Sequence, residues 1–252
     1  MGNSELVSII TPCYNGEKTI QETILSVLNQ TYPNWEMLII DDCSIDSSKT
    51  LIHNFTSRDS RIKYLKTKSS SGSPTMPRNI GIENAKGRFI AFLDCDDLWL
   101  PTKLEEQIPL LNDTNTAIAF SYYEKISEEG KRNNRIIISP NQITYKQLLK
   151  ENVIGCLTAI YDTQKVGKIY FSEIGHEDYA MWLSILKKGY IAKNTNTTLA
   201  LYRISNNSIS SNKITAFKWT WNIYRKVERL PLYKSIYYFM NYAFRAGYKF
   251  LK

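Results

Sequence analysis

A regular alternation of apolar and amphipathic segments in the first hundred residues most constrains the fold. The segments "LVSIITP" (6–12), "WEMLIIDD" (35–42) and "RFIAFLD" (88–94) have the length and composition of buried strands. Between the first two, "KTIQETILSVLNQ" (18–30) places its apolar residues at helical spacing. Parallel strands joined by right-handed helical crossovers produce this order. The pattern predicts an α/β fold with a mostly parallel central sheet and flanking helices.

The second half of the chain has a more mixed pattern. Strands are predicted at 117–126 and 135–139, and a short helix at 145–152. The segment "GHEDYAMWLSILKKG" (175–189) predicts a longer helix, with acids in its first turn, lysines in its last and a glycine beyond. A strand beginning near 197 leads into a polar loop that extends to 213.

Cysteine usage and hydropathy exclude several classes of protein. The four cysteines have no CxxC spacing, which indicates free thiols in a reducing compartment, and two histidines give a zinc site little support. No apolar run approaches the roughly 20 residues that a membrane span needs, and no secretory leader is expected. The absence of G-x-G-x-x-G after the first strand disfavours a nicotinamide dehydrogenase.

The formal net charge of +8 is unevenly distributed. From Lys213 to Lys252 there are nine basic residues and one acid, Glu228, so the first 212 residues are neutral. Lys234, Asn241 and Arg245, with 249 and 252, fall on one strip of a helix, away from the apolar side chains. This predicts a basic amphipathic helical tail (213–252) that binds an anionic membrane surface. Packing of the helix on the body is the alternative, while nucleic acid is disfavoured by the neutral body.

Acidic residues follow two of the predicted strands. Asp41 and Asp42 end the second strand, and Asp94, Asp96 and Asp97 end the strand at 88–94. Ligands of open parallel sheets bind beyond the carboxyl ends of the strands. Asp94 and Asp96 lie on one side of an extended segment and are hard-oxygen ligands, suited to Mn²⁺ or Mg²⁺ together with substrate phosphates. Asp97, on the other side, is interpreted as a helix cap or as a support of the site.

The order and spacing of these segments carry a resemblance to a known family. "SIITPCYNGEKTIQETILSVLNQTYPNWEMLIIDDCSIDSS", "RNIGIENAKGRFIAFLDCDD" and "HEDYAMWLSILKKG" together resemble a family 2 glycosyltransferase of the GT-A fold. The resemblance is specific over about residues 6–110, fair over 150–212 and absent from the tail. It implies a GT-A domain at 1–212, with a nucleotide-sugar-binding half (1–115) and an acceptor or catalytic half (116–212).

The resemblance also implies roles for residues of the nucleotide side. Pro12 and Tyr14 would border the base, with Tyr14 as a stacking face, and Asp42 would accept a hydrogen bond from uracil. Asp42 is also placed where a helix cap is common, so a structural role stays open. Arg78 would contact the diphosphate or the D-x-D carboxylates, or else lie on the surface.

The D-x-D motif and the later segments have implied catalytic roles. Asp94 and Asp96 form the motif, with Asp96 touching the metal that bridges the donor diphosphate. Arg203, in a Y-R segment, would reach the leaving diphosphate. In "HEDY", Asp178 is the expected general base beside Glu177, although either acid could instead complement the helix N-terminus. His176 would orient the base or the acceptor, or be structural.

The function implied is the inverting, metal-dependent transfer of one sugar from a nucleotide sugar, expected to be UDP-linked, to a saccharide acceptor. The missing Q-x-x-R-W motif of processive members argues against polymerisation. By analogy, the acceptor is expected to be lipid-linked and to serve bacterial surface polysaccharide synthesis, with the protein cytoplasmic and peripheral on the inner face of the membrane. A catalytically silent protein that binds a sugar nucleotide or a membrane on the same fold is the alternative.

Overall fold

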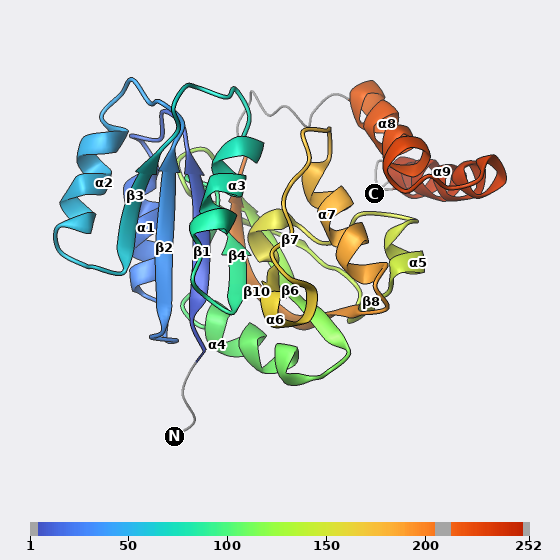
Figure 1. Cartoon of the computed structure of the whole chain (residues 1–252), viewed down its shortest axis with the longest axis horizontal. Coiled ribbons are helices and arrows are strands. Elements are labelled where there is room, and N and C mark those ends of the chain that lie inside the picture. Colours follow the sequence, from blue (N-terminus) through green and yellow to red (C-terminus); the bar gives the residue numbers. More distant parts are fainter. Residues whose placement is uncertain (1–4, 205–212, 249–252) are drawn as a thin grey trace.

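A computed structural model describes residues 5–204 and 213–248, with side chains over 215–245 in the second range (Figure 1). The first half is built as the sequence predicts, from β1 (Val7–Cys13), β2 (Trp35–Asp41), β3 (Ile62–Lys66) and β4 (Phe89–Phe92). These strands pair in parallel in the order β3-β2-β1-β4. Their connecting helices are α1 (Ile20–Leu28), α2 (Ser48–Thr56) and α3 (Thr75–Asn84).

The second half of the sheet is mixed. The order continues β4-β9-β6-β10-β5, with antiparallel pairs at β4–β9, β9–β6 and β10–β5 and a parallel pair at β6–β10. β7 pairs with β6, and β8 pairs with β10. The bounds are β5 (Leu98–Trp99), β6 (Thr116–Ile126), β7 (Arg132–Ile137), β8 (Gln142–Ile143), β9 (Ile160–Asp162) and β10 (Ile191–Arg203). The predicted α/β class is therefore confirmed, with the parallel arrangement concentrated in the first half.

Helices cover both faces of this sheet because its strands are apolar on both sides. In β1, Val7 and Ile9 pack in one core with α1, α2 and α4 (Lys103–Gln107). Ile10 packs in the other core with α3, α5 (Tyr145–Leu148) and α7 (Glu177–Leu186). The helix α7 is almost entirely buried, as its apolar sequence requires. The remaining helix of the body is α6 (Thr163–Val166), and 3₁₀ turns lie at Ile108–Asn112 and Cys156–Thr158.

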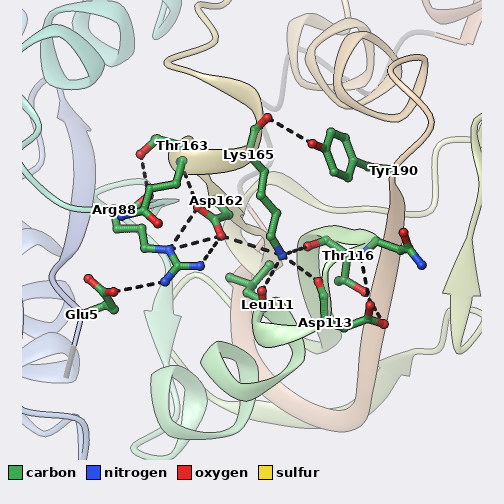
Figure 2. Close-up of polar contacts among 11 residues, drawn as sticks. Glu5, Arg88, Leu111, Asp113, Thr116, Asp162, Thr163, Lys165 and Tyr190 are labelled. Atoms are coloured by element: carbon green, nitrogen blue, oxygen red, sulfur yellow. Dashed lines mark hydrogen bonds and ion pairs between the residues drawn. The ribbon is translucent and has the colours of Figure 1, made fainter. Parts of the chain in front are cut away.

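A polar network joins the two halves at the edge where β4 begins (Figure 2). Arg88 donates from Nη2 to Asp162 Oδ2 at 2.8 Å, and from Nη1 to Glu5 at 3.1 Å. Asp162 is fully buried at the end of β9 and also caps α6. The Lys165 ammonium donates to three main-chain carbonyls, of residues 111, 113 and 116 (Figure 2). Each buried charge thus has hydrogen-bond partners, which burial of charge demands.

The tail is a helical hairpin at one end of the molecule (Figure 1). It consists of α8 (Lys213–Asn222), a π-helical turn (Ile223–Val227) and α9 (Leu232–Tyr248). Ile223 and Tyr224 are buried in the same core as α3 and α7, and the Tyr224 hydroxyl donates to the Leu149 carbonyl at 2.6 Å. The first part of the hairpin is therefore integral to the body. No helix among the described residues is long and apolar enough to cross a bilayer.

One face of α9 is apolar and exposed. Ser235, Tyr238 and Phe239 turn towards the protein, while the opposite side carries six exposed apolar side chains. They are Leu232, Tyr233, Ile236, Tyr237, Met240 and Phe244. At about 100° per residue, Lys234 and Arg245 lie beside this face. The apolar side chains of the predicted amphipathic helix are thus directed to solvent rather than to the core; positions 249, 251 and 252 lie outside the described residues.

Candidate active site

The carboxyl ends of β1, β2 and β4 meet at one edge of the sheet because the strands are parallel. Cys13 pairs with Asp41 and Ile10 with Phe92 in register, which brings the three following loops together. A cavity of about 940 Å³ opens beside them. Its walls come from the 71–76 loop, the D-x-D segment, the 173–178 turn, the end of β10 and one residue of α8.

Arg78 organises the acids of this cavity. It is buried at the start of α3, and its Nη2 donates to both oxygens of Asp94, at 2.7 and 2.8 Å. Its Nη1 donates to Glu177 Oε1 at 2.9 Å. The guanidinium therefore joins the D-x-D motif to the first turn of α7, which is 99 residues away in sequence. A planar fork of donors suits this bridge between two carboxylates.

Three other acids line the cavity without a cationic partner among the described ion pairs: Asp96, Glu173 and Asp178. Of these, Asp96 and Asp178 have clearly shifted pKa values. Burial, followed by the charge of Asp94, raises the pKa of Asp96 to about 6. Burial, followed by the charge of Glu177, raises the pKa of Asp178 to about 6. Asp178 Oδ1 accepts a hydrogen bond from the Tyr179 amide at 2.7 Å. Two carboxylates with raised pKa values in one cleft are a candidate catalytic arrangement.

Asp97 supports the site from behind. It is buried, and its Oδ1 accepts a hydrogen bond from the Arg203 amide at 2.9 Å. The interpretation of Asp97 as a helix cap is wrong, because α4 begins after Thr102. Thr23 of α1 fixes the same segment: its hydroxyl lies 2.9 Å from the carbonyl oxygens of both Cys95 and Asp97.

Arg203 lines the cavity, and each nitrogen of its guanidinium makes one hydrogen bond within the protein. Nε donates to the Asp96 carbonyl at 2.8 Å, Nη1 to the Glu128 carbonyl and Nη2 to Glu22 Oε2, both at 2.7 Å. In this structure Arg203 therefore holds the D-x-D segment in place. Each of its two Nη nitrogens carries a second N–H that these three hydrogen bonds do not use.

The candidates for contact with the base, Pro12, Tyr14 and Asp42, do not line the cavity, whereas Arg78, Asp94 and Arg203 do. Pro12 is buried within β1, and Tyr14 is exposed in the following loop. The carboxylate of Asp42 accepts hydrogen bonds from the Ser71 amide at 2.9 and 3.0 Å and from the Ser71 hydroxyl at 2.9 Å. Asp42 does not cap α2, whose N-cap is Ser47. The Ser/Gly-rich loop at 69–73 is thus held against Asp42 by these hydrogen bonds.

Two loops beside Tyr14 are joined by reciprocal hydrogen bonds that sequence reasoning missed. The Glu17 amide donates to Asp46 Oδ2 at 3.0 Å, and the Ser47 amide donates to Glu17 Oε2 at 3.1 Å. Asn15, in a left-handed conformation, adds two more such contacts. The loops after β1 and β2 therefore form one unit. No local sequence signal marks this pairing, because it depends on the register of the strands.

The turn before α7 places His176 and Trp219 together. His176 is the N-cap residue in a left-handed conformation, and its ring makes an edge-to-face contact with Trp219 of α8, with centroids 5.2 Å apart. Burial lowers the pKa of His176. Trp219 lines the cavity and was not predicted, since nothing in the tail's sequence indicates such a distant contact.

Comparison with known proteins identifies the family. Residues 8–163 match the model for glycosyl transferase family 2. The chain belongs to this family. It is 43% identical over 241 residues to the Escherichia coli UDP-Glc:α-D-GlcNAc-diphosphoundecaprenol β-1,3-glucosyltransferase WfgD, covering 94% of this chain and 92% of that protein. Bacillus subtilis TuaG, provisionally named a teichuronic acid biosynthesis glycosyltransferase, is 42% identical over 239 residues and 94% of each chain.

Solved structures of transferases share the fold of this family 2 member. Staphylococcus aureus TarS (residues 1–349), in complex with UDP-GlcNAc, superposes with a TM-score of 0.74 at 19% identity, covering 95% of this chain and 72% of that one. The Pyrobaculum calidifontis mannosyltransferase PcManGT, in complex with GDP-Man and Mn²⁺, has a TM-score of 0.69 at 16% identity, covering 91% and 66%. The GT-A architecture expected from the sequence is confirmed, and the protein is a glycosyltransferase related to those of bacterial surface polysaccharide synthesis.

Proposed function

We propose that this family 2 enzyme transfers one sugar from a UDP-sugar, with inversion and without processivity, to a lipid-linked saccharide in bacterial surface polysaccharide synthesis. O-antigen, capsule and lipooligosaccharide are the products considered. The observation that carries the proposal is the Arg78 bridge, which fixes Asp94 and Glu177 and leaves Asp96 and Asp178 facing one cavity. The names of two relatives support UDP-glucose and a GlcNAc-diphospholipid as the first substrates to test.

Asp178 acts as the general base in this proposal. Its carboxylate accepts the proton of the acceptor hydroxyl while that oxygen attacks the anomeric carbon of the donor. The bond from the anomeric carbon to the diphosphate oxygen breaks, and its electron pair leaves with UDP. Attack from the face opposite the diphosphate inverts the anomeric configuration. Glu177 holds Arg78, and its neighbouring charge contributes to the raised pKa of Asp178, which brings the base nearer to neutral pH.

The D-x-D carboxylates fit a divalent cation, Mn²⁺ or Mg²⁺. Asp96 is a hard-oxygen ligand whose pKa is raised by burial and by Asp94, and a bound cation would favour its ionised form. The described residues contain no cluster of three or more ligating side chains, so substrate phosphate oxygens would complete the coordination. When bound, the cation neutralises charge on the departing diphosphate. Asp94, held by Arg78, orients the motif.

The nucleotide is proposed to bind beside the cavity, against the loops after β1 and β2. Pro12 and the exposed ring of Tyr14 would border the base, and Asp42 would accept the imide hydrogen bond of uracil. The Ser71 loop must release Asp42 for this contact. Arg78 and Arg203 would lie near the diphosphate, to which Arg203 would offer the Nη hydrogens that its present partners do not use.

The hairpin is proposed to hold the enzyme on an anionic membrane, at its cytoplasmic inner face. The exposed apolar face of α9, with Lys234 and Arg245 beside it, is suited to insertion at the headgroup level. A lipid-linked acceptor, of the kind named for WfgD, would be presented at the same surface.

The Asp178→Asn variant tests the catalytic proposal. With UDP-glucose, Mn²⁺ and a GlcNAc-diphospholipid, we expect UDP release on transfer to fall by roughly 10²-fold or more, because the acceptor proton has no base. UDP affinity, measured by calorimetry, should be nearly unchanged. If the wild-type protein binds UDP but transfers no sugar from any nucleotide sugar in a panel, the catalytically silent alternative is correct.

A further inference from the structure

Trp219, on the first helix of the C-terminal hairpin, contributes a wall of the active-site cavity. It lies on α8, and its half-buried indole lines the same space as Asp178 and Asp96. Among the described side chains of the hairpin, it alone lines this cavity. The neighbouring aromatic residue of α8, Trp221, instead packs against Phe239 of α9, with ring centroids 5.3 Å apart.

The position of the indole is fixed by a close contact with the turn before α7. A Cβ atom added to Gly175 would lie 2.0 Å from Trp219 Cδ2 and 2.1 Å from Cγ, so the ring rests where a side chain would otherwise be. The ring of His176 meets the same indole edge to face. Glycine at 175 is therefore required for this packing, and the indole is held beside the first turn of α7, where Asp178 lies.

We infer that Trp219 is the acceptor-binding platform of the enzyme, which positions the saccharide by contact between the indole and a face of the acceptor pyranose ring. This inference rests on the proposed function and identifies the part of the site that selects the acceptor. It assigns the α8 side of the cavity to the acceptor and the D-x-D side to the donor.

The chemistry of the two surfaces supports this assignment. A pyranose has faces formed by C–H groups, and an aromatic ring presents a partly negative face to which such hydrogens are attracted. Hydroxyls at the sugar's edge then remain free for polar partners, and Asp178 lines the same cavity. Beside the acids and arginines of this cavity, the indole offers a flat apolar surface that would hold a sugar in one orientation.

Substitution of the two tryptophans of α8 provides a matched test. The Trp219→Ala enzyme, full length and assayed with UDP-glucose and GlcNAc α-linked to a diphosphoryl alkyl chain, should show an acceptor KM raised by about tenfold or more. Its UDP affinity, measured by calorimetry, should be unchanged. Trp221→Ala, which alters the α8–α9 contact but not the cavity, should leave the acceptor KM within about twofold.

Two further variants separate a binding platform from a structural contact. Trp219→Phe, which keeps an aromatic face, should restore most of the acceptor affinity, whereas Trp219→Leu, which fills space without such a face, should not. Gly175→Ala should raise the acceptor KM as Trp219→Ala does, because the new Cβ displaces the indole. In the double variant the two effects should not add, since both remove the same contact.

The outcomes distinguish this inference from the proposed function. An unchanged acceptor KM in Trp219→Ala, or equal recovery by leucine and phenylalanine, would overturn the inference while wild-type transfer stands. If the wild type transfers no sugar, calorimetry still tests whether Trp219 binds the acceptor. The titrant is the same saccharide, in the presence of UDP and Mn²⁺. Loss of that binding in Trp219→Ala supports the platform, and equal binding by both proteins rejects it.

Discussion

Glu177 and Asp178 are neighbours in sequence but have different surroundings. Glu177 accepts a hydrogen bond from Arg78, whereas Asp178 faces the cavity, and burial with the Glu177 charge raises its pKa to about 6. The sequence alone indicated Asp178 through a family resemblance. The structure supplies a physical distinction between the two acids, because only one of them is tied to a buried arginine.

The titration of Asp178 predicts the acid limb of the activity profile. A base must be deprotonated, and a pKa raised to about 6 means that the active fraction falls as the pH drops below that value. We expect kcat/KM for transfer to fall about tenfold per unit well below pH 6. The measurement is a pH series at saturating Mn²⁺, which keeps the D-x-D acids ionised. A flat profile down to pH 4.5 would contradict this role.

The closed loop on Asp42 predicts an unusual effect on donor affinity. Ser71→Ala removes a hydroxyl hydrogen bond to Asp42 and should raise the open fraction of the loop. Because affinity scales with the competent fraction, UDP should bind several-fold more tightly. Calorimetry with Ser70→Ala as the control, whose contact with Asp42 is longer at 3.4 Å, measures the difference. Weaker binding of UDP by Ser71→Ala would contradict this prediction and would indicate that the Ser71 hydroxyl contacts the nucleotide.

The helix α9 makes the membrane proposal testable by point substitution. Met240 and Phe244 are 64% and 75% exposed, so changing both to serine should leave the fold intact. Loss of their burial should weaken binding to vesicles containing phosphatidylglycerol by about tenfold or more. Leu25→Ser, which removes an exposed apolar side chain on α1, is the control. Unchanged cosedimentation of the double variant would reject this face as the membrane contact.

Truncation after Asn212 would test the membrane proposal less cleanly than these point substitutions. Ile223 and Tyr224 are buried in the core, and Glu228 accepts hydrogen bonds from Tyr145 and Lys187. Removing these residues would expose the body as well as delete the tail. The charge pattern predicted a separate basic segment because it shows only which residues are charged. It does not show which apolar residues of the body a helix packs against.

The predictable and unpredictable elements differ in the range of their contacts. Strands β1, β2 and β4 follow from short apolar runs, and Asp94 and Asp96 follow from their position at a strand end. Arg78 reaches Glu177 across 99 residues, and Trp219 reaches the turn at Gly175 from another helix. Such contacts depend on how strands and helices are arranged in three dimensions, so no local sequence pattern predicts them.

The whole fold depends on the junction between its parallel and mixed halves. At β4–β9, Asp162 is fully buried and bonded to Arg88 (Figure 2). Arg88→Ala would leave this carboxylate with Lys165 at 3.8 Å, so the free energy of unfolding should fall by about 3–5 kcal/mol. Glu5→Ala, which removes the exposed partner of the same arginine, should cost less than about 1 kcal/mol. Urea unfolding of both variants measures this, and equal losses would contradict it.

The hairpin at one end of the long axis also makes the molecule an electric dipole (Figure 1). The first 212 residues are neutral, and the entire excess of +8 belongs to the segment from 213 onward. The electric field of an anionic membrane would rotate such a molecule before it makes contact. The field extends over the Debye length, which is about 8 Å at physiological salt. The molecule would arrive with α8 and α9 foremost. Raising the ionic strength should therefore lower the rate of association with the membrane, because the approaching molecules are no longer oriented. The rate of dissociation should change little, because apolar contacts are not screened by salt.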